Sequence, residues 1–103
     1  MSKRDKSYED NLMQSLLNPK EAAAYIDAVM ELEDKSALLL AIRQVAKAHG
    51  MAEVARNAAL GEKTLFKSLS DDGNPTLETM NKILHSVGLR LSVVASALQP
   101  SLR

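Results

Sequence analysis

Two short apolar-patterned segments, residues 51–58 and 62–69, constrain the fold of this chain most strongly, because only residues 59–61 separate them. Helices this short are not stable alone in water, so each must be held by packing. Leu60, in the connection, can fill the space between them. The other inward positions are expected to be Val54, Ala55 and Ala58 on the first helix and Leu65 and Leu69 on the second. This pattern predicts a helix-turn-helix.

Three longer helices are predicted around this pair. The first, over residues 18–30, begins with Asn18 as its cap and Pro19 at the first helical position. The second spans residues 36–49 and ends before Gly50. The third starts after Thr76 as its cap, stops at Gly88, and is expected to bury Leu77, Met80, Ile83 or Leu84, and Val87.

Near the end of the chain, the spacing of apolar side chains is no longer that of a helix. Residues 89–93 alternate between apolar and polar side chains, which is typical of a strand, and this strand could pair with its copy in a second subunit. The expected fold is therefore all-α, with five helices and a short C-terminal strand. The expected divisions are a flexible N-terminal arm over residues 1–17, a helix-turn-helix domain over residues 18–96 and a C-terminal tail over residues 97–103.

Charge is distributed unevenly along a chain whose net charge is zero. Residues 1–36 carry five basic and eight acidic side chains, whereas residues 37–103 carry eight basic and five acidic ones. A neutral total disfavours a simple nucleic-acid binder, because phosphate contacts require Lys and Arg. An acidic front and a basic back instead indicate two different partners.

The second helix of the pair is the candidate reading helix, because its N-terminal turn would point at base edges in the major groove. Lys63 and Lys67 can donate to guanine or phosphate, Thr64 can contact a phosphate or a thymine methyl, and Glu62 can accept from cytosine. Arg56 adds positive charge, as do Arg43 and Lys47, and the backbone amides of Met51 and Ala52 could hold a phosphate. The predicted DNA-binding residues are Met51, Ala52, Arg56, Glu62, Lys63, Thr64 and Lys67.

The same residues have a plainer interpretation. Short helix pairs are common in helical domains, and exposed lysines often serve only solubility. Spacing alone therefore leaves DNA binding and solubility open. Phe66 is expected in the core, with contact to a base methyl group as its alternative.

Several function classes are not expected. The chain has no cysteine, and its two histidines, His49 and His85, lack nearby carboxylates at metal-ligand spacing, so neither a metal site nor a cofactor is predicted. No phosphate loop, nucleophile elbow or paired catalytic set is present, so an enzyme is not expected. No apolar run reaches membrane-spanning length and no signal sequence is evident, which predicts a cytoplasmic protein.

The sequence also resembles a known family. The segments VAKAHGM, VARNAALGEKTLFKSLSDDGNPTLETMNKIL and SVGLRLSV, preceded by AAAYIDAVME, are similar to the probable addiction module antidote proteins. These are HigA-like antitoxins with an XRE-type helix-turn-helix, related to phage lambda repressor. The resemblance covers about residues 19–94, and its most specific parts are the SDDGNP loop and the closing GLRLSV.

This resemblance implies a function as well as a fold. It implies a bundle of about five helices with a terminal strand, which binds operator DNA as a homodimer. It implies a small mRNA-cleaving toxin as partner, which the protein neutralises while repressing the shared operon. We further expect the acidic front, with Glu31, Glu33 and Asp34, to contact that toxin.

The chain departs from the related repressor pattern in the helix pair. Ala59 stands in the turn where glycine is usual and a left-handed backbone is favoured, and Gly61 replaces a serine cap. Ala52 and Glu62 stand where glutamines are common. These changes bear on the strength and sequence preference of DNA binding.

Three hypotheses remain open at this point. The chain is an antitoxin that also represses, a stand-alone transcriptional regulator of prophage-repressor type, or a protein-binding module that no longer touches DNA. A toxin-sized reading frame beside the gene would favour the first over the second. Salt-sensitive retention on heparin would favour either over the third.

Overall fold

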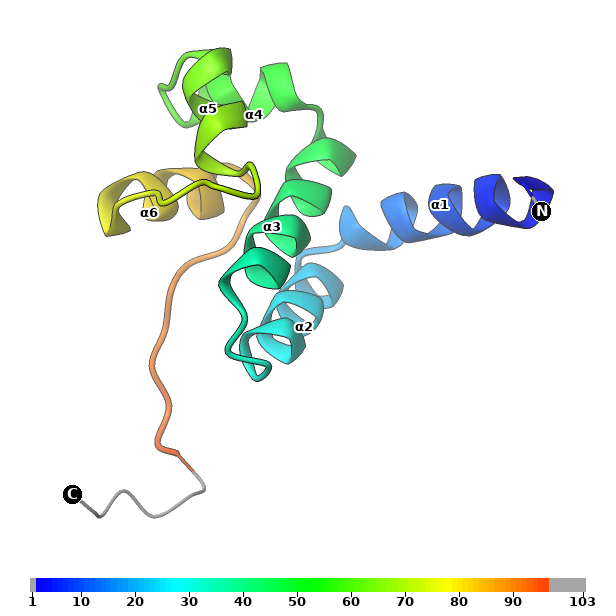
Figure 1. Ribbon diagram of the computed structural model, residues 1–103, viewed down its shortest axis with the longest axis horizontal. Coiled ribbons are helices and arrows are strands. Elements are labelled where there is room, and N and C mark those ends of the chain that lie inside the picture. Colours follow the sequence, from blue (N-terminus) through cyan, green and yellow to red (C-terminus); the bar gives the residue numbers. More distant parts are fainter. Residues whose placement is uncertain (1, 97–103) are drawn as a thin grey trace.

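The computed structural model describes residues 2–96 and is helical (Figure 1). Three helices form the first half, and α3 lies at the centre of the molecule against α1, α2 and α4. The short helices α4 and α5 lie at one end, with α6 beneath them. The helices are α1 (Ser2–Leu16), α2 (Pro19–Met30), α3 (Lys35–His49), α4 (Met51–Asn57), α5 (Glu62–Ser68) and α6 (Leu77–Ser86).

Helix α1 corrects the prediction of five helices and a loose arm over residues 1–17. It projects to one side of the bundle, and its base packs on α2 and α3 (Figure 1). Leu16 is buried at 1% exposure, and Leu12 packs against the core. The i, i+4 spacing of these leucines gives the helix one apolar stripe, which is inconspicuous among the many polar residues of this segment.

The predicted strand over residues 89–93 is absent from the part of the chain that the structure describes. These residues run as an extended, irregular segment after α6, and Leu89 and Leu91 pack against the core. The side chains alternate with the period of a strand, but a strand also needs a hydrogen-bonded neighbour, and residues 2–96 contain no strand that could pair with this segment. The predicted tail over residues 97–103 lies outside the described residues.

Local capping signals explain where the longer helices begin. The side-chain oxygen of Asn18 accepts from the Lys20 amide at 2.9 Å, and Thr76 accepts from the Thr79 amide at 3.1 Å, as the sequence predicts. One cap was missed. Asp34 accepts from the Ala37 amide at 3.1 Å and starts α3 at Lys35, one residue before the predicted start.

The core is aliphatic and continuous. Val45 of α3, Leu65 of α5 and Ile83 of α6 are each completely buried. On α6, Leu77 is an exception among the expected core residues, since it is 70% exposed. The first turn of α6 lies at the edge of the bundle, and the buried residues of this helix, Ile83 and Leu84, lie more than a turn later.

Tyr25 joins α2 to α3. Its hydroxyl donates a hydrogen bond to Gln44, and burial, with a smaller contribution from Tyr8, raises the pKa of the Tyr25 phenol above its ordinary value. Within residues 2–96, no helix combines the length and apolar character needed to cross a membrane.

Candidate nucleic-acid interface

Helices α4 and α5 are joined by a tight turn whose backbone geometry is that of a Schellman motif. The amide of Leu60 donates to the carbonyl oxygen of Ala55 at 2.8 Å, and the amide of Ala59 donates to that of Arg56 at 3.1 Å. Ala59 has a φ of 58°, so the predicted left-handed position is confirmed. Leu60 packs against the core as expected, which fixes α5 relative to α4.

Replacing Ala59 by glycine should therefore stabilise the fold. A side chain in the left-handed region costs about 1–2 kcal/mol, and glycine removes that cost. Glycine also loses more conformational entropy on folding than alanine, which lowers the free energy of unfolding by about 0.5–1 kcal/mol. We expect Ala59→Gly to raise the free energy of unfolding by up to about 1 kcal/mol. The matched control is Ala24→Gly, at an exposed position within α2, which should lower it by about 1 kcal/mol. Urea unfolding of both variants measures the difference, and a loss of stability in both would contradict the interpretation of the turn.

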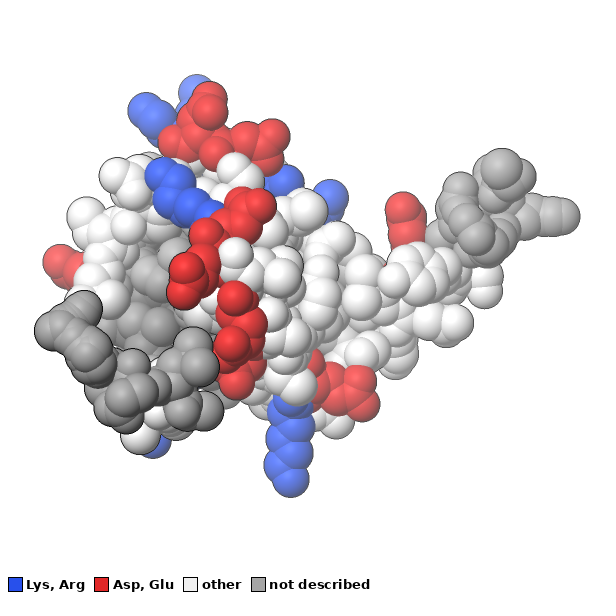
Figure 2. Space-filling view, turned by 60° about the horizontal axis from the view of Figure 1, so that its bottom comes forward, with Lys and Arg blue, Asp and Glu red and all other residues white. Residues whose placement is uncertain are grey.

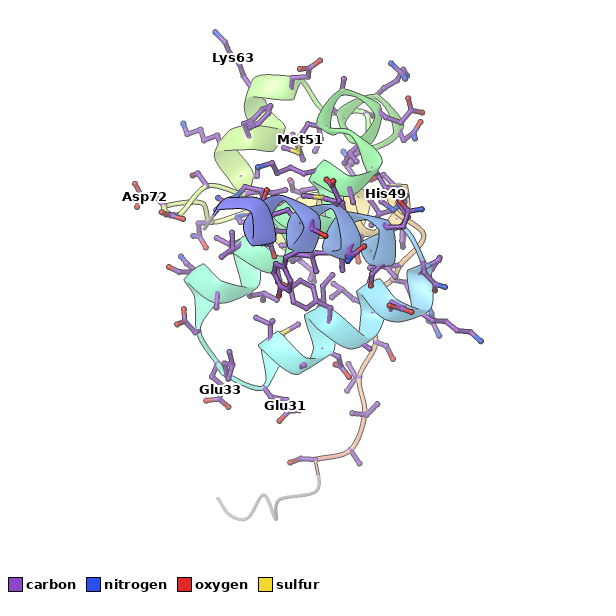
Figure 3. All side chains as sticks on the ribbon, turned by 90° about the vertical axis from the view of Figure 1, so that its right-hand side faces the viewer. Glu31, Glu33, His49, Met51, Lys63 and Asp72 are labelled. Atoms are coloured by element: carbon purple, nitrogen blue, oxygen red, sulfur yellow. The ribbon has the colours of Figure 1, made fainter. Side chains whose placement is uncertain are left out.

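The structure brings four of the predicted DNA-binding residues together on the exposed side of α5. Leu65 and Leu69 are completely buried, which turns the opposite face of the helix to solvent. The ammonium groups of Lys63 and Lys67 on this helix form no ion pair with any described residue. Figure 3 shows Lys63 pointing away from the bundle, at the end opposite Glu31 and Glu33. The four exposed side chains are those of Glu62, Lys63, Thr64 and Lys67.

The three predicted DNA-binding residues on α4 differ in their exposure and in their contacts. Arg56 is exposed but forms an ion pair with Glu53 on the same helix. Ala52 is exposed, whereas the Met51 side chain packs against the core, so only its backbone could reach a phosphate. Exposed ion pairs contribute little, so a phosphate could compete with Glu53 for the Arg56 guanidinium.

Arg43 has a structural partner that the sequence did not reveal. Its guanidinium donates to the carbonyl oxygen of Leu69 at 2.7 Å and lies 3.7 Å from a carboxylate oxygen of Asp71. The arginine thus satisfies a carbonyl at the C-terminus of α5, where positive charge is favourable. Arg43 orients the candidate reading helix and is not a free surface cation.

Phe66 lies outside the core, contrary to the first expectation. Its side chain is 49% exposed on α5, one residue before Lys67. Helix α5 buries only the narrow stripe of Leu65 and Leu69, and Phe66 falls beside that stripe.

The SDDGNP loop after α5 has a structural role. Gly73 is buried, and its amide donates to the carbonyl oxygen of Ser70 at 2.8 Å. A Cβ atom at Gly73 would lie 2.1 Å from the carbonyl oxygen of Ser68 and 2.9 Å from that of Lys67. The loop therefore requires glycine for close packing against the last turn of α5.

At the other end of the molecule, the turn between α2 and α3 forms an acidic tip, made of residues 30–34. Leu32 and Met30 are 66% and 44% exposed there, beside Glu31 and Glu33. Asp34 caps α3, as described above, so it is partly structural. Figure 2 turns this end of the molecule toward the viewer and shows acidic side chains gathered along the middle of the face.

Comparison with known proteins gives matches that cover most of the described chain. A family model described as "Probable addiction module antidote protein" matches residues 8–95, from α1 to the extended segment after α6. An uncharacterized protein of Haemophilus influenzae strain Rd is 28% identical over 86 residues, which covers 84% of this chain and 89% of that protein. No solved structure matches the chain significantly.

Proposed function

The chain belongs to the probable addiction module antidote protein family, and from this we propose that it is the antitoxin of a type II toxin–antitoxin module in the cytoplasm. It neutralises a small mRNA-cleaving toxin and, as a homodimer with a HigA-like, XRE-type helix-turn-helix, represses its own operon.

The exposed face of α5 supports the DNA-binding part of this proposal. Two lysines and a threonine project from a helix that Leu65, Leu69 and Arg43 hold at one end of the molecule. A second helix of this kind enters the major groove with its first turn toward the bases. Two copies related by a two-fold axis would place two α5 helices on half-sites about one helical turn apart.

The acidic tip supports the toxin-binding part. A toxin that acts on mRNA must attract a polyanion, so its surface is basic, and the tip offers both carboxylates and exposed apolar side chains. The tip and Lys63 lie at opposite ends of the molecule (Figure 3). Toxin and operator therefore have separate surfaces.

Two measurements test the proposal. The purified protein should bind a DNA fragment from upstream of its own gene more tightly than unrelated DNA, with an affinity that falls as salt rises. Co-expression should also rescue growth of cells that express the adjacent reading frame. DNA binding without rescue would favour a stand-alone regulator, and rescue without DNA binding would favour a protein-binding module.

Charge reversal at the tip should slow the encounter with the toxin. Glu31→Lys with Glu33→Lys changes four units of charge without touching the cap at Asp34, and we expect an association rate constant at least about tenfold lower at low salt, with a weaker salt dependence. Stopped-flow mixing with the toxin measures this rate. The control Glu78→Lys with Glu9→Lys makes the same change in net charge at exposed positions on α6 and α1. Equal rates in both double variants would exclude the tip from the interface.

A further inference from the structure

The candidate DNA-binding surface carries little net positive charge. Helices α4 and α5 together contain three basic and two acidic side chains. Lys63 and Lys67 on α5 form no ion pair with a described residue, whereas Arg56, the one basic residue of α4, is paired with Glu53. Attraction to DNA of any sequence depends on how many phosphates free cations can neutralise. The surface therefore offers one cation fewer than its sequence contains for as long as Glu53 holds Arg56.

Glu53 binds its neighbours through both carboxylate oxygens. One oxygen accepts a hydrogen bond from the Arg56 guanidinium, and the other accepts one from the side-chain amide of Asn57 at 3.4 Å. All three residues are exposed, and none of their side chains forms a hydrogen bond or an ion pair with a described residue outside α4. Helix α4 is held in the bundle by Val54 and Ala55, which are buried in the core. The bonds of Glu53 thus act on the solvent-facing surface and do not join α4 to another helix.

The bond between Arg56 and Glu53 can open when a phosphate is placed beside it. The two side chains are 67% and 54% exposed, and an ion pair with this exposure is weak. A phosphate can accept two parallel hydrogen bonds from a guanidinium, which makes it a strong competitor for Arg56. Glu53 repels a phosphate that approaches in any other position. The position of the phosphate relative to α4 therefore decides whether Arg56 changes its partner.

We propose that Glu53 is a specificity-determining residue, which keeps Arg56 away from phosphates until the base contacts of α5 have placed the duplex in register. This inference rests on the proposed function, because it requires that α5 read an operator. On unrelated DNA no base contact fixes the register, and Arg56 stays paired with Glu53. On the operator, contacts from Lys63 hold a phosphate beside Arg56, and the guanidinium binds it. The ion pair thus weakens non-specific binding more than operator binding, and the ratio of these two affinities decides how well a repressor finds its site.

Glu53→Gln tests the inference, because the amide keeps the size of the side chain and removes its charge. We expect the affinity of the full-length variant for a duplex of unrelated sequence to rise about tenfold at low salt, with a salt slope steeper by about one per subunit, since Arg56 becomes a free phosphate contact. Affinity for the upstream fragment should rise only about two- to fivefold, with an unchanged slope, because Arg56 already binds a phosphate there. Fluorescence anisotropy with both duplexes across a salt series measures the four values.

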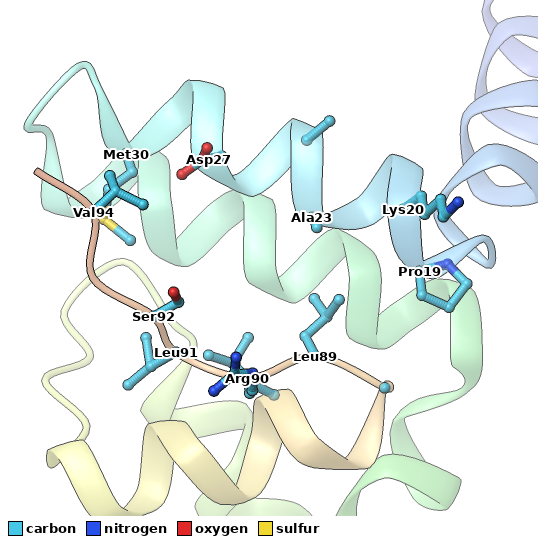
Figure 4. A pocket seen from close by; sticks show the side chains of 13 residues that line it. Pro19, Lys20, Ala23, Asp27, Met30, Leu89, Arg90, Leu91, Ser92 and Val94 are labelled. Atoms are coloured by element: carbon cyan, nitrogen blue, oxygen red, sulfur yellow. The ribbon is translucent and has the colours of Figure 1, made fainter. Parts of the chain in front are cut away.

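Two control variants separate this effect from a general change in charge. Asp27→Asn removes one negative charge from α2, which packs on α1 and α3 and lies beside the extended segment that follows α6 (Figure 4). Glu78→Gln breaks another exposed ion pair within one helix, since a Glu78 carboxylate oxygen lies 3.7 Å from the Lys82 ammonium on α6. We expect neither control to change the ratio of operator affinity to non-specific affinity, because a charge remote from the duplex acts on both DNA sequences alike.

The double variant Glu53→Gln with Arg56→Ala identifies the route of the effect. If Glu53 acts by holding Arg56, the gain in affinity for unrelated DNA should disappear when residue 56 is already alanine. A gain that persists without Arg56 would overturn the inference, because Glu53 would then act through its charge alone. An equal gain on both duplexes would also overturn it. Circular dichroism confirms that each variant is folded.

The outcomes distinguish this inference from the proposed function. If the wild-type protein prefers its upstream fragment and Glu53→Gln binds both duplexes as the wild type does, the inference fails while operator binding stands. If neither protein binds DNA, operator binding and the inference fail together. A Glu53→Gln variant that binds unrelated DNA more tightly and discriminates less, only while Arg56 is present, supports both.

Discussion

Gly73→Ala should lower the free energy of unfolding by more than about 3 kcal/mol, a loss at the upper end of the effects of single substitutions. The new methyl group would lie 2.1 Å from the carbonyl oxygen of Ser68. Neither atom can move freely, because that carbonyl belongs to the last turn of α5 and Gly73 is itself hydrogen-bonded to Ser70. Relief would require the loop to pull away from α5, which would separate Asp71 in this loop from the Arg43 guanidinium.

Gly61→Ala is the matched control for this substitution. A Cβ atom at Gly61 meets nothing closer than the Thr64 hydroxyl at 3.9 Å, and the backbone φ is −70°. Alanine makes the unfolded chain stiffer than glycine does, which raises the free energy of unfolding, but alanine is a slightly poorer N-cap residue, which lowers it. Because the two effects oppose each other, the free energy of unfolding should change by no more than about 0.5 kcal/mol. Thermal and urea unfolding of both variants provide the comparison. Similar stability of the two variants would contradict the tight packing of the loop.

Lys63→Ala and Lys67→Ala should weaken operator binding in two distinguishable ways. We expect Lys63, in the first turn of α5, to contact a base, and its loss should cost about 1–3 kcal/mol per half-site and relax the sequence preference. Lys67, one turn later, can contact a base or a phosphate. If it contacts a phosphate, its loss should weaken binding to all sequences and reduce the salt slope by about one per contact. Fluorescence anisotropy with the upstream fragment across a salt series separates the two.

Lys35→Ala controls for the lost charge. Lys35 is exposed at the start of α3, beside the acidic tip and away from α5, so its removal should leave DNA affinity nearly unchanged. Unfolding curves should show that all three variants retain their stability. Wild-type affinity in both Lys63→Ala and Lys67→Ala would mean that α5 does not read DNA, and the candidate interface would be wrong.

The local features of this fold were accessible from sequence, because their causes lie within a few residues. The caps at Asn18 and Thr76 and the left-handed turn at Ala59 are set by neighbouring side chains and backbone bonds. The inward positions of α5 followed from helical spacing in the same way.

The features that were missed depend on distant parts of the chain. Arg43 and Leu69 are 26 residues apart, and nothing near the arginine indicates that it binds the end of another helix. Phe66 and Leu77 are hydrophobic but exposed, because tertiary packing decides which part of an apolar face is covered. The same limit applies to the segment after α6, whose period suits a strand although no neighbour within the described chain pairs with it.

The length of helix α3 determines how far a toxin bound at the acidic tip would lie from DNA bound at the other end of the molecule. It starts at the cap in the acidic tip and ends at Gly50, directly before α4. Fifteen residues at a rise of 1.5 Å span about 22 Å. The major groove is only about 8.5 Å deep, so a toxin held at the tip would stand clear of the duplex. Occupancy of one surface would then leave the other physically accessible. Any influence of toxin on operator affinity would have to act through the contact between the two copies or through the packing along α3.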